Sequence, residues 1–397
     1  MQVSEAFIVA AARTPVGKAN RGALRSVRPE QLGATAVAGA LARVPGLAGE
    51  RVDDVVMGCA FPEGPQGMNV ARAIARRAGL PNSVPAATVN RFCSSGLQSI
   101  AQATAGVMAG HLDVVVAGGV ECMSLVPQGG FYFAPDPHLT GNDPGFYTSM
   151  GITAENVAER YAVSREDQDV FALRSHRRAL DAIESGRFAD EIVGVDVEED
   201  VYDSEARAAM HVRRRHEVDE GPRADTTSEA LAKLRPVFKA GGTVTAGNAS
   251  QMNDGAAAVV VMSRAAMDEL GATPRARLAG YAVAGVDPEV MGMGPVNAVP
   301  KLLAQTGMRI EDIELFELNE AFASQSLAVV RELGLDEELV NVNGGAIALG
   351  HPLGCTGAKL TATLLYEMER RRVRWGIVTM CIGGGMGAAG LFENLRT

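Results

Sequence analysis

The sequence lacks long apolar runs and long basic runs. Its N-terminal apolar run, residues 7–12, is too short to cross a bilayer and has no basic lead like that of a signal peptide. No later uncharged stretch approaches the length of a membrane span. The 37 Lys and Arg against 47 Asp and Glu give a formal charge of −10, which argues against nucleic-acid binding. We therefore expect neither a membrane nor a nucleic acid as partner, although an anionic small ligand needs only a local cluster of cations.

Closely spaced cysteine pairs are also missing. The cysteines are odd in number and show no C-x-x-C spacing; they are Cys59, Cys93, Cys122, Cys355 and Cys381. A secreted disulfide framework is therefore disfavoured, and reduced thiols in a cytosol are the default. The sequence predicts a cytoplasmic protein.

What the chain does contain is typical of a soluble globular protein, with 47% hydrophobic residues over 397 positions, enough for two or three domains. Apolar strand-like runs alternate with helical patterns in two series of matching order, at 5–12, 52–60 and 113–119, then at 275–286, 313–319 and 375–385. Continuous apolar strands predict a buried, largely parallel sheet. The repeated order predicts two duplicated α/β halves.

Residues 121–250 interrupt this pattern. They include a capping-box-like helix start at Ser164 and Asp167 and a strongly charged stretch at 197–223. We interpret the segment as an insertion into the first half, and its charge run as a solvated surface.

Cys93 stands immediately before a helical pattern whose apolar face includes Leu97 and Ile100. At a helix N-terminus the dipole and free N–H groups favour a thiolate, although an isolated cysteine is more often a buried, inert thiol. His351 lies in a Gly/Pro turn at the same stage of the second half. A cysteine together with a histidine is the pairing that makes a thiolate nucleophile.

Cys381 ends an apolar strand and is followed closely by glycines at 383–385. Residues 385–390 spell G-x-G-x-x-G, but only seven residues remain after Gly390, too few for the helix and acidic residue of a dinucleotide site. Exposed backbone donors beside a thiol suit an oxyanion hole better. Asn319, at a strand end just before a helix, fits either a helix cap or a group that holds a water or an oxyanion.

Several blocks of the chain resemble the signature blocks of the thiolases, specifically of 3-ketoacyl-CoA thiolase (acetyl-CoA acyltransferase): NRFCSSGLQ, TAGNASQMNDGAAA, NEAFA, NGGAIALGHPLGCTGA and CIGGGMGAA. The likeness runs nearly end to end. It implies the thiolase fold, with two duplicated α/β halves in five layers (α-β-α-β-α) and an inserted loop domain. The expected domains are an N-terminal half at 1–120, the loop domain at 121–250, completion of the N-terminal half at 251–272 and a C-terminal half at 273–397.

The resemblance also implies thiolytic cleavage of a 3-ketoacyl-CoA by CoA, through an acyl-cysteine. Cys93 would be the nucleophile, His351 would lower the Cys93 pKa and stabilise charge on the thioester oxygen, and Asn319 would hold a water at that oxygen. Cys381 would be the acid and base. Backbone N–H groups of Cys93 and Gly383 would form a second oxyanion hole, and the other three cysteines would be structural.

By the same resemblance CoA is a co-substrate, while no cofactor is bound permanently and no metal is involved. Ser250 would touch the pantetheine, Arg223 would lie near the nucleotide end of CoA, and Phe238 near its adenine or pantetheine. Met150 is a further expected substrate contact. The family implies a homodimer or homotetramer, and a hydratase/dehydrogenase is a candidate partner enzyme.

One departure bears on the substrate. Short-chain acetoacetyl-CoA thiolases typically carry His-Met-Gly where this chain has Ser149 before Met-Gly. That difference favours the degradative, broader-chain branch that acts in fatty-acid β-oxidation. The alternative within the family is a short-chain acetyl-CoA acetyltransferase.

Three alternatives lie outside this interpretation. A decarboxylating ketoacyl synthase uses two histidines where this chain has Asn319 and Cys381. A zinc site could combine His351 and Cys355 with Cys93 and Cys381, but it would lack the tight cysteine spacing of structural zinc sites. A non-catalytic thiolase-like protein is disfavoured by the intact catalytic set.

Overall fold

The computed structural model describes residues 4–203 and 207–396. The first half of the fold contains β1 (Ala6–Arg13), β2 (Gly17–Lys18), α1 (Pro29–Ala42), β3 (Asp54–Gly58), α2 (Val70–Arg77), β4 (Ala86–Val89), α3 (Ser95–Met108), β5 (Val114–Cys122), β8 (Asn253–Ser263) and α8 (Arg264–Glu269). The second half contains β9 (Ala276–Gly285), α9 (Gly294–Thr306), β10 (Leu315–Leu318), α10 (Ala323–Leu333), α11 (Ala346–Leu349), α12 (Leu353–Arg371), β11 (Trp375–Ile382) and β12 (Met386–Asn394).

The two halves repeat one arrangement of strands. In the first half β1 pairs antiparallel with β8, β8 antiparallel with β5, and β5 parallel with β3. In the second half β9 pairs antiparallel with β12, β12 antiparallel with β11, and β11 parallel with β10. The halves meet at an antiparallel bridge between Ile8 and Ala276, giving the order β10-β11-β12-β9-β1-β8-β5-β3-β4. The predicted duplication is confirmed.

The expectation of a largely parallel sheet is wrong. Parallel pairing is confined to β3 with β4, β3 with β5, and β10 with β11, and the other ladders of this sheet are antiparallel. The apolar runs misled because a strand covered by helices on both faces is apolar throughout, whatever the direction of its neighbours. All eleven residues of β8 are buried, for example, although both of its long ladders, to β1 and to β5, are antiparallel.

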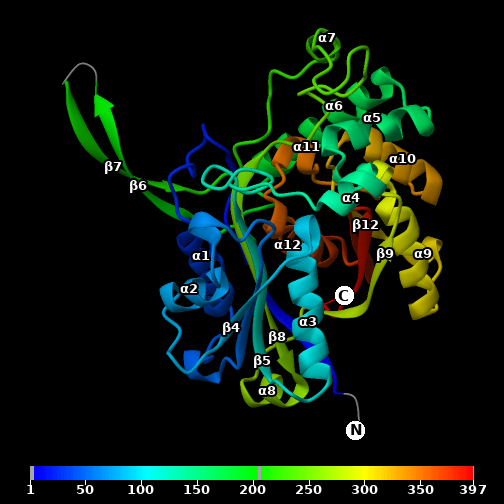
Figure 1. The fold of residues 1–397 in the computed structure, drawn as a ribbon. Helices are drawn as coiled ribbons and strands as arrows, with labels where there is room; N and C mark the ends of the chain where they lie inside the picture. Colours follow the sequence, from blue (N-terminus) through cyan, green and yellow to red (C-terminus); the bar gives the residue numbers. More distant parts are fainter. Residues whose placement is uncertain (1–3, 204–206, 397) are drawn as a thin grey trace.

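Helices cover both faces of each half of the sheet (Figure 1). Helices α1 and α2 share a hydrophobic core with the outer face of the first half, and α9 and α10 with the outer face of the second. Between the halves, α3 and α12 form a third core with the inner faces of both. This is the five-layer α-β-α-β-α fold that the resemblance implied, and its central layer positions the candidate site.

Helices α3 and α12 approach each other at their N-terminal ends through glycines. A Cβ on Gly96 would lie 2.7 Å from the backbone nitrogen of Ala358 and 3.0 Å from the carbonyl oxygen of Gly354. A Cβ is essentially never accommodated so close to backbone atoms, so only glycine permits this contact. Cys93 precedes α3 and His351 precedes α12, and the close packing therefore brings the two turns into one region.

The chain leaves the sheet after β5 and returns at β8. In between it forms α4 (Pro137–Asn142), α5 (Met150–Arg160), α6 (Arg165–Glu184), β6 (Val195–Asp203), β7 (Ala208–His216) and α7 (Ser228–Ala232). The β6–β7 hairpin projects away from the rest of the molecule (Figure 1). Within the described residues, no helix is long and apolar enough to cross a membrane.

A buried arginine ties the inserted segment to the sheet. The guanidinium of Arg13, on β1, lies 2.5 Å from Glu191 and makes two 2.8 Å bonds to Asp219. All three side chains are at most 1% exposed. Removing one partner would leave an uncompensated buried charge, which typically costs about 3–5 kcal/mol, so this triad fixes where the insertion sits.

Candidate active site

Cys93 lies in a short, strained turn. The 3-10 turn Phe92–Ser94 leads directly into α3, and Phe92 has a φ of 43°, in the left-handed region that bulky residues rarely adopt. The Phe92 N–H donates to Asn90 Oδ1 at 2.8 Å, and the Ser95 hydroxyl donates to the Phe92 carbonyl at 2.6 Å. Such strain persists only where the surroundings hold it in place. Here it presents the thiol at the start of the helix.

The second half of the fold supplies the groups around this thiol. The Phe92–Ser94 turn packs against α12 and β11, the strand that contains Cys381. Main-chain N–H groups of Gly383 and of Cys93 itself lower the pKa of the Cys93 thiol. A Cβ on Gly383 would be 3.9 Å from Phe92 and from Met150 Sδ. Gly383 therefore lies between the Phe92–Ser94 turn and the start of α5.

His351 is held by three fixed contacts. Its backbone N–H donates to Asn253 Oδ1 at 3.0 Å, its Nδ1 is 2.6 Å from Thr356 Oγ1, and its Nε2 is 3.3 Å from Asn319 Nδ2. The preceding Gly350 has a φ of 92°, and a Cβ there would lie 2.4 Å from the Asn253 side chain. Glycine is thus required for the turn that places the imidazole.

Asn319 is fully buried, and one of its side-chain atoms has no partner. Its Nδ2 faces His351, while its Oδ1 makes no hydrogen bond with any described residue. A buried amide oxygen without a partner is costly, and the usual remedy is an ordered water or a ligand. Of the two roles open to Asn319 in the sequence, this favours a group that holds a water. Its side chain caps no helix, because α10 begins after Phe322 with no side-chain cap.

Burial controls the charge state of the site. Desolvation raises the pKa of Cys93 to about 11, against the opposing effect of the Gly383 and Cys93 N–H groups. Burial, followed by the nearby Cys93, raises the pKa of Cys381 as well. Burial and the Lys359 ammonium lower the pKa of His351 to about 3. The N–H groups at the helix terminus lower the pKa of Cys93, in the direction expected from the sequence, but desolvation outweighs them.

Two supporting residues escaped the sequence analysis. Glu121, buried in β5, accepts hydrogen bonds from Ala60 N at 2.8 Å, Gln66 Nε2 at 2.6 Å and Gly354 N at 2.7 Å. It thereby joins the start of α12 to the loop after β3. An acidic residue inside an apolar strand was the available signal for Glu121. No sequence signal pointed to Asn253, because nothing in the sequence links it to His351.

Three of the four expected CoA contacts lie around the NEAFA segment, 319–323. The Ser250 N–H donates to the Ala321 carbonyl at 2.9 Å. Phe238 packs edge-on against Phe322, and a Cβ on Gly151, next to Met150, would meet the Phe238 ring. The structure thus brings Ser250, Phe238 and Met150 together near Asn319.

Arg223 lies apart from that group. Its exposed side chain pairs with Asp225, and its backbone N–H donates to His176 Nδ1 at 3.2 Å. No described hydrogen bond or ion pair joins it to another expected site residue.

The remaining thiols are in the core. Cys59, Cys122 and Cys355 are buried and, like Cys93 and Cys381, are free. Burial raises the pKa of Cys355 to about 12 and raises that of the other two as well. Across residues 4–203 and 207–396, no group of three or more His, Cys, Asp or Glu side chains is placed to hold a metal ion.

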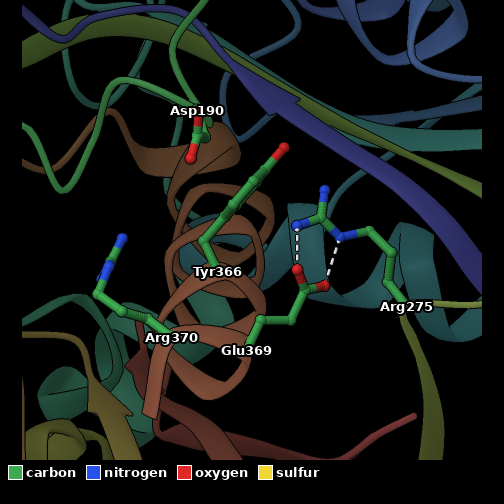
Figure 2. Close-up of a pocket in the computed structure, with 5 residues that line it drawn as sticks. All are labelled: Asp190, Arg275, Tyr366, Glu369 and Arg370. Atoms are coloured by element: carbon green, nitrogen blue, oxygen red, sulfur yellow. Dashed lines mark hydrogen bonds and ion pairs between the residues drawn. The ribbon is translucent and has the colours of Figure 1, made fainter. Parts of the chain in front are cut away.

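A separate surface hollow is lined by none of the expected site residues; it is bordered by Asp190, Arg275, Tyr366, Glu369 and Arg370 (Figure 2). Two of its charged groups, Arg275 and Glu369, bind each other. Arg275 makes 2.7 and 2.8 Å bonds to Glu369 and stacks over the Tyr366 ring at 3.9 Å. The hollow therefore contains a structural ion pair rather than a candidate catalytic site.

The whole chain is similar to known enzymes of one class. Sequence models of the thiolase N-terminal domain and the thiolase C-terminal domain match residues 6–265 and 272–394. The fold, the central cysteine turn and these matches define an acyltransferase. The chain belongs to the thiolase family.

Individual relatives cover nearly the full length. A 3-ketoacyl-CoA thiolase of Bacillus subtilis is 56% identical, covering 98% of this chain and 100% of the relative. An acetyl-CoA acetyltransferase of Syntrophomonas wolfei is 46% identical, covering 98% and 99%. The crystal structure of the Bacillus anthracis acetyl-CoA acetyltransferase superposes with a TM-score of 0.90 at 43% identity, over 99% of this chain and 100% of that one.

Proposed function

We propose that the protein cleaves 3-ketoacyl-CoA with CoA, giving acetyl-CoA and an acyl-CoA shortened by two carbons. The observation that carries this proposal is the arrangement around Cys93. The turn that carries Cys93 packs against β11, which contains Cys381, and against α12, which follows His351. His351 in turn contacts Asn319 at 3.3 Å, and main-chain N–H groups of Gly383 and Cys93 lower the pKa of the thiol. The full-length similarity to a 3-ketoacyl-CoA thiolase supports the same reaction.

In the first step Cys93 Sγ attacks the ketone carbon of the substrate. The Cys93 proton passes to His351, whose imidazole is neutral before the substrate binds. The bond between the ketone carbon and the α-carbon then breaks. The Cys381 thiol protonates the α-carbanion, and acetyl-CoA leaves. The acyl chain remains on Cys93 as a thioester.

In the second step the Cys381 thiolate removes the proton from the thiol of incoming CoA. The CoA sulfur attacks the acyl-thioester carbon, and N–H groups of Gly383 and Cys93 stabilise the oxyanion of the tetrahedral intermediate. Cys93 departs as a thiolate and recovers its proton from His351. A water bound to the unpartnered Asn319 Oδ1 would stabilise negative charge on the thioester oxygen of the substrate.

The inserted segment, 121–250, is proposed as the loop domain that receives CoA. The other proposed domains are the N-terminal half at 1–120, completed by 251–272, and the C-terminal half at 273–397. Ser250, Phe238 and Met150 border the NEAFA segment and are the proposed pantetheine and substrate contacts. Arg223, exposed on this segment, is the proposed contact for the nucleotide end. CoA serves as co-substrate, with no permanently bound cofactor.

We favour the degradative, broader-chain branch. Ser149, where short-chain enzymes typically carry histidine, is exposed and begins α5 without a side-chain cap. The branch assignment rests on this difference in residue type before Met150. The second candidate is a short-chain acetyl-CoA acetyltransferase. The similarity to enzymes of that name supports this alternative.

The deciding experiment compares CoA-dependent cleavage of acetoacetyl-CoA and of a long-chain 3-ketoacyl-CoA by the same preparation, with Cys93→Ser as control. Efficient long-chain cleavage that the variant lacks is the expected result. Activity confined to acetoacetyl-CoA would move the protein to the short-chain branch. Cleavage of neither substrate would overturn the proposal.

A homodimer or homotetramer in the cytoplasm is proposed, with a hydratase/dehydrogenase as candidate partner. The end strand β4 supports self-association, because within the described residues it pairs with β3 alone. An unpaired sheet edge is a common place for a second chain to add. Light scattering of the purified protein tests this, and a monomer at micromolar concentration would contradict it.

A further inference from the structure

Both ring nitrogens of His351 face a fixed polar group. Thr356 Oγ1, on the first turn of α12, is 2.6 Å from Nδ1, and Asn319 Nδ2 is 3.3 Å from Nε2. Both neighbours are buried. Because burial and the Lys359 ammonium lower the pKa of His351 to about 3, the ring is neutral in ordinary conditions. A neutral imidazole carries one proton, and which nitrogen holds it is decided by these neighbours.

The hydroxyl of Thr356 has a second contact, which decides whether the hydroxyl or the imidazole donates the hydrogen bond between them. Thr356 Oγ1 is also 2.9 Å from the carbonyl oxygen of Pro352. A carbonyl oxygen can only accept, so the single hydroxyl proton belongs in that contact. Thr356 Oγ1 then offers a lone pair to His351, and Nδ1 must carry the ring proton. The reverse arrangement would leave two oxygens facing each other at 2.9 Å with no proton between them.

The other side of the ring agrees with this assignment. With the proton on Nδ1, Nε2 has a free lone pair, and the amide N–H of Asn319 donates to it. The opposite tautomer would set an Nε2–H against the Asn319 amide hydrogens, unless the amide turned over.

We propose that Thr356 is a positioning residue that holds His351 as the Nδ1–H tautomer and so keeps Nε2 ready to take the proton of Cys93. The inference rests on the function proposed above. When the proton leaves Sγ for Nε2, the imidazolium keeps its Nδ1–H bond to Thr356 and gains an Nε2–H, which displaces the Asn319 N–H from that nitrogen. Thr356 touches no reacting atom and acts only through His351.

The chain offers a matched control on the same helix. Thr361 Oγ1 donates to the carbonyl of Gly357 at 2.8 Å, the same bond to the residue four positions earlier that Thr356 makes to Pro352. Thr361 is buried as well, but it has no described hydrogen bond to a histidine. Thr361→Val therefore removes the same helix contact without the proposed role.

The direct test is nitrogen-15 NMR of the histidine rings in the full-length protein, with His351→Asn to assign the signal. Wild type and Thr356→Ser should show a protonated Nδ1 and an unprotonated Nε2. Thr356→Val should move the proton toward Nε2. A wild-type signal from the Nε2–H tautomer would overturn the proposal, and so would an unchanged tautomer in Thr356→Val. If Thr356→Val does not fold, the wild-type spectrum and Thr356→Ala still decide.

Kinetics give a second readout on the 3-ketoacyl-CoA cleavage reaction. Thr356→Val should lower kcat about 10- to 100-fold with little change in KM, since residues that fix a tautomer act on the chemical step. Thr356→Ser and Thr361→Val should stay close to wild type. An equal loss in Thr361→Val would reduce Thr356 to a structural role. If wild type itself shows no cleavage, the proposed function fails while the NMR result still decides the tautomer.

Discussion

At the scale of single residues, the site rests as a neutral pair. The Cys93 thiol is protonated because desolvation raises its pKa to about 11, and His351 is uncharged because its pKa falls to about 3. Charge therefore appears only when a substrate arrives and a proton moves. A half-buried, protonated thiol in the proposed nucleophile role depends on its base more than an exposed thiolate does.

This charge state predicts a steep pH dependence for modification of Cys93. Below pH 11 the thiolate fraction should rise about tenfold for each pH unit, so alkylation by iodoacetamide should accelerate throughout the range from pH 7 to 10. Peptide mass spectrometry on timed samples measures it, with Cys93→Ser to identify the peptide. A rate already level at pH 7 would mean that the resting site holds a thiolate.

Asn319 should matter through its unpartnered Oδ1 and its contact with His351. Replacing it with alanine removes the side chain that would bind the proposed water. Loss of one group that stabilises an oxyanion typically lowers kcat about 10²- to 10³-fold. Steady-state cleavage of a 3-ketoacyl-CoA is the measurement. Asn142→Ala, on exposed α4, is the control and should behave like wild type. An active Asn319→Ala protein would remove Asn319 from the mechanism.

At the scale of elements, the site depends on the contact of α3 with α12. Gly96→Ala would drive a methyl group to 2.7 Å from backbone nitrogen, so we expect a loss of about 1–3 kcal/mol in the free energy of unfolding and a loss of activity. Urea denaturation measures the first. Gly141→Ala, where a Cβ meets open space, should cause no such loss. Equal stability of the two variants would contradict the packing argument.

The helices and strands show which parts of the fold could be predicted from the sequence. The apolar runs located strands such as β1 and β11, and their repeated order predicted the duplication. Their directions could not be predicted, because burial on both faces hides whether a neighbour is parallel. The sequence singles out Cys93 because it precedes a helical pattern, and His351 because it lies in a Gly/Pro turn at the same stage of the second half. Thr356 and Asn253 were missed, because their roles arise from contacts with His351 that follow no periodic pattern.

At the scale of the whole molecule, the insertion is held to the sheet by buried polar contacts. The Arg13 triad is such a contact, and within the insertion itself His176 of α6 accepts a hydrogen bond from the Arg223 backbone. Burial, with the Arg223 and Lys18 charges, lowers the pKa of His176 to about 4. The folded protein therefore resists protonation there, while the unfolded chain takes up a proton below about pH 6.5.

The sign of the resulting pH effect follows. A histidine whose folded pKa is lowered stabilises the fold above pH 6.5, and that stability is lost as pH falls toward 4. For His176 the loss is about 3 kcal/mol between pH 7 and pH 4. His176→Gln should show a smaller fall in unfolding free energy over this range, measured by denaturant titration. His138→Gln, an exposed site, should match wild type, and identical slopes for all three proteins would contradict the account.

The central claim is that Cys93 carries the acyl group between two substrates. The most direct measurement is intact-protein mass spectrometry after mixing the enzyme with a long-chain 3-ketoacyl-CoA in the absence of free CoA. We predict a mass increase equal to the shortened acyl group, mapped by peptide analysis to Cys93 and removed when CoA is added. No adduct despite release of acetyl-CoA, or an adduct on another residue, would contradict the account.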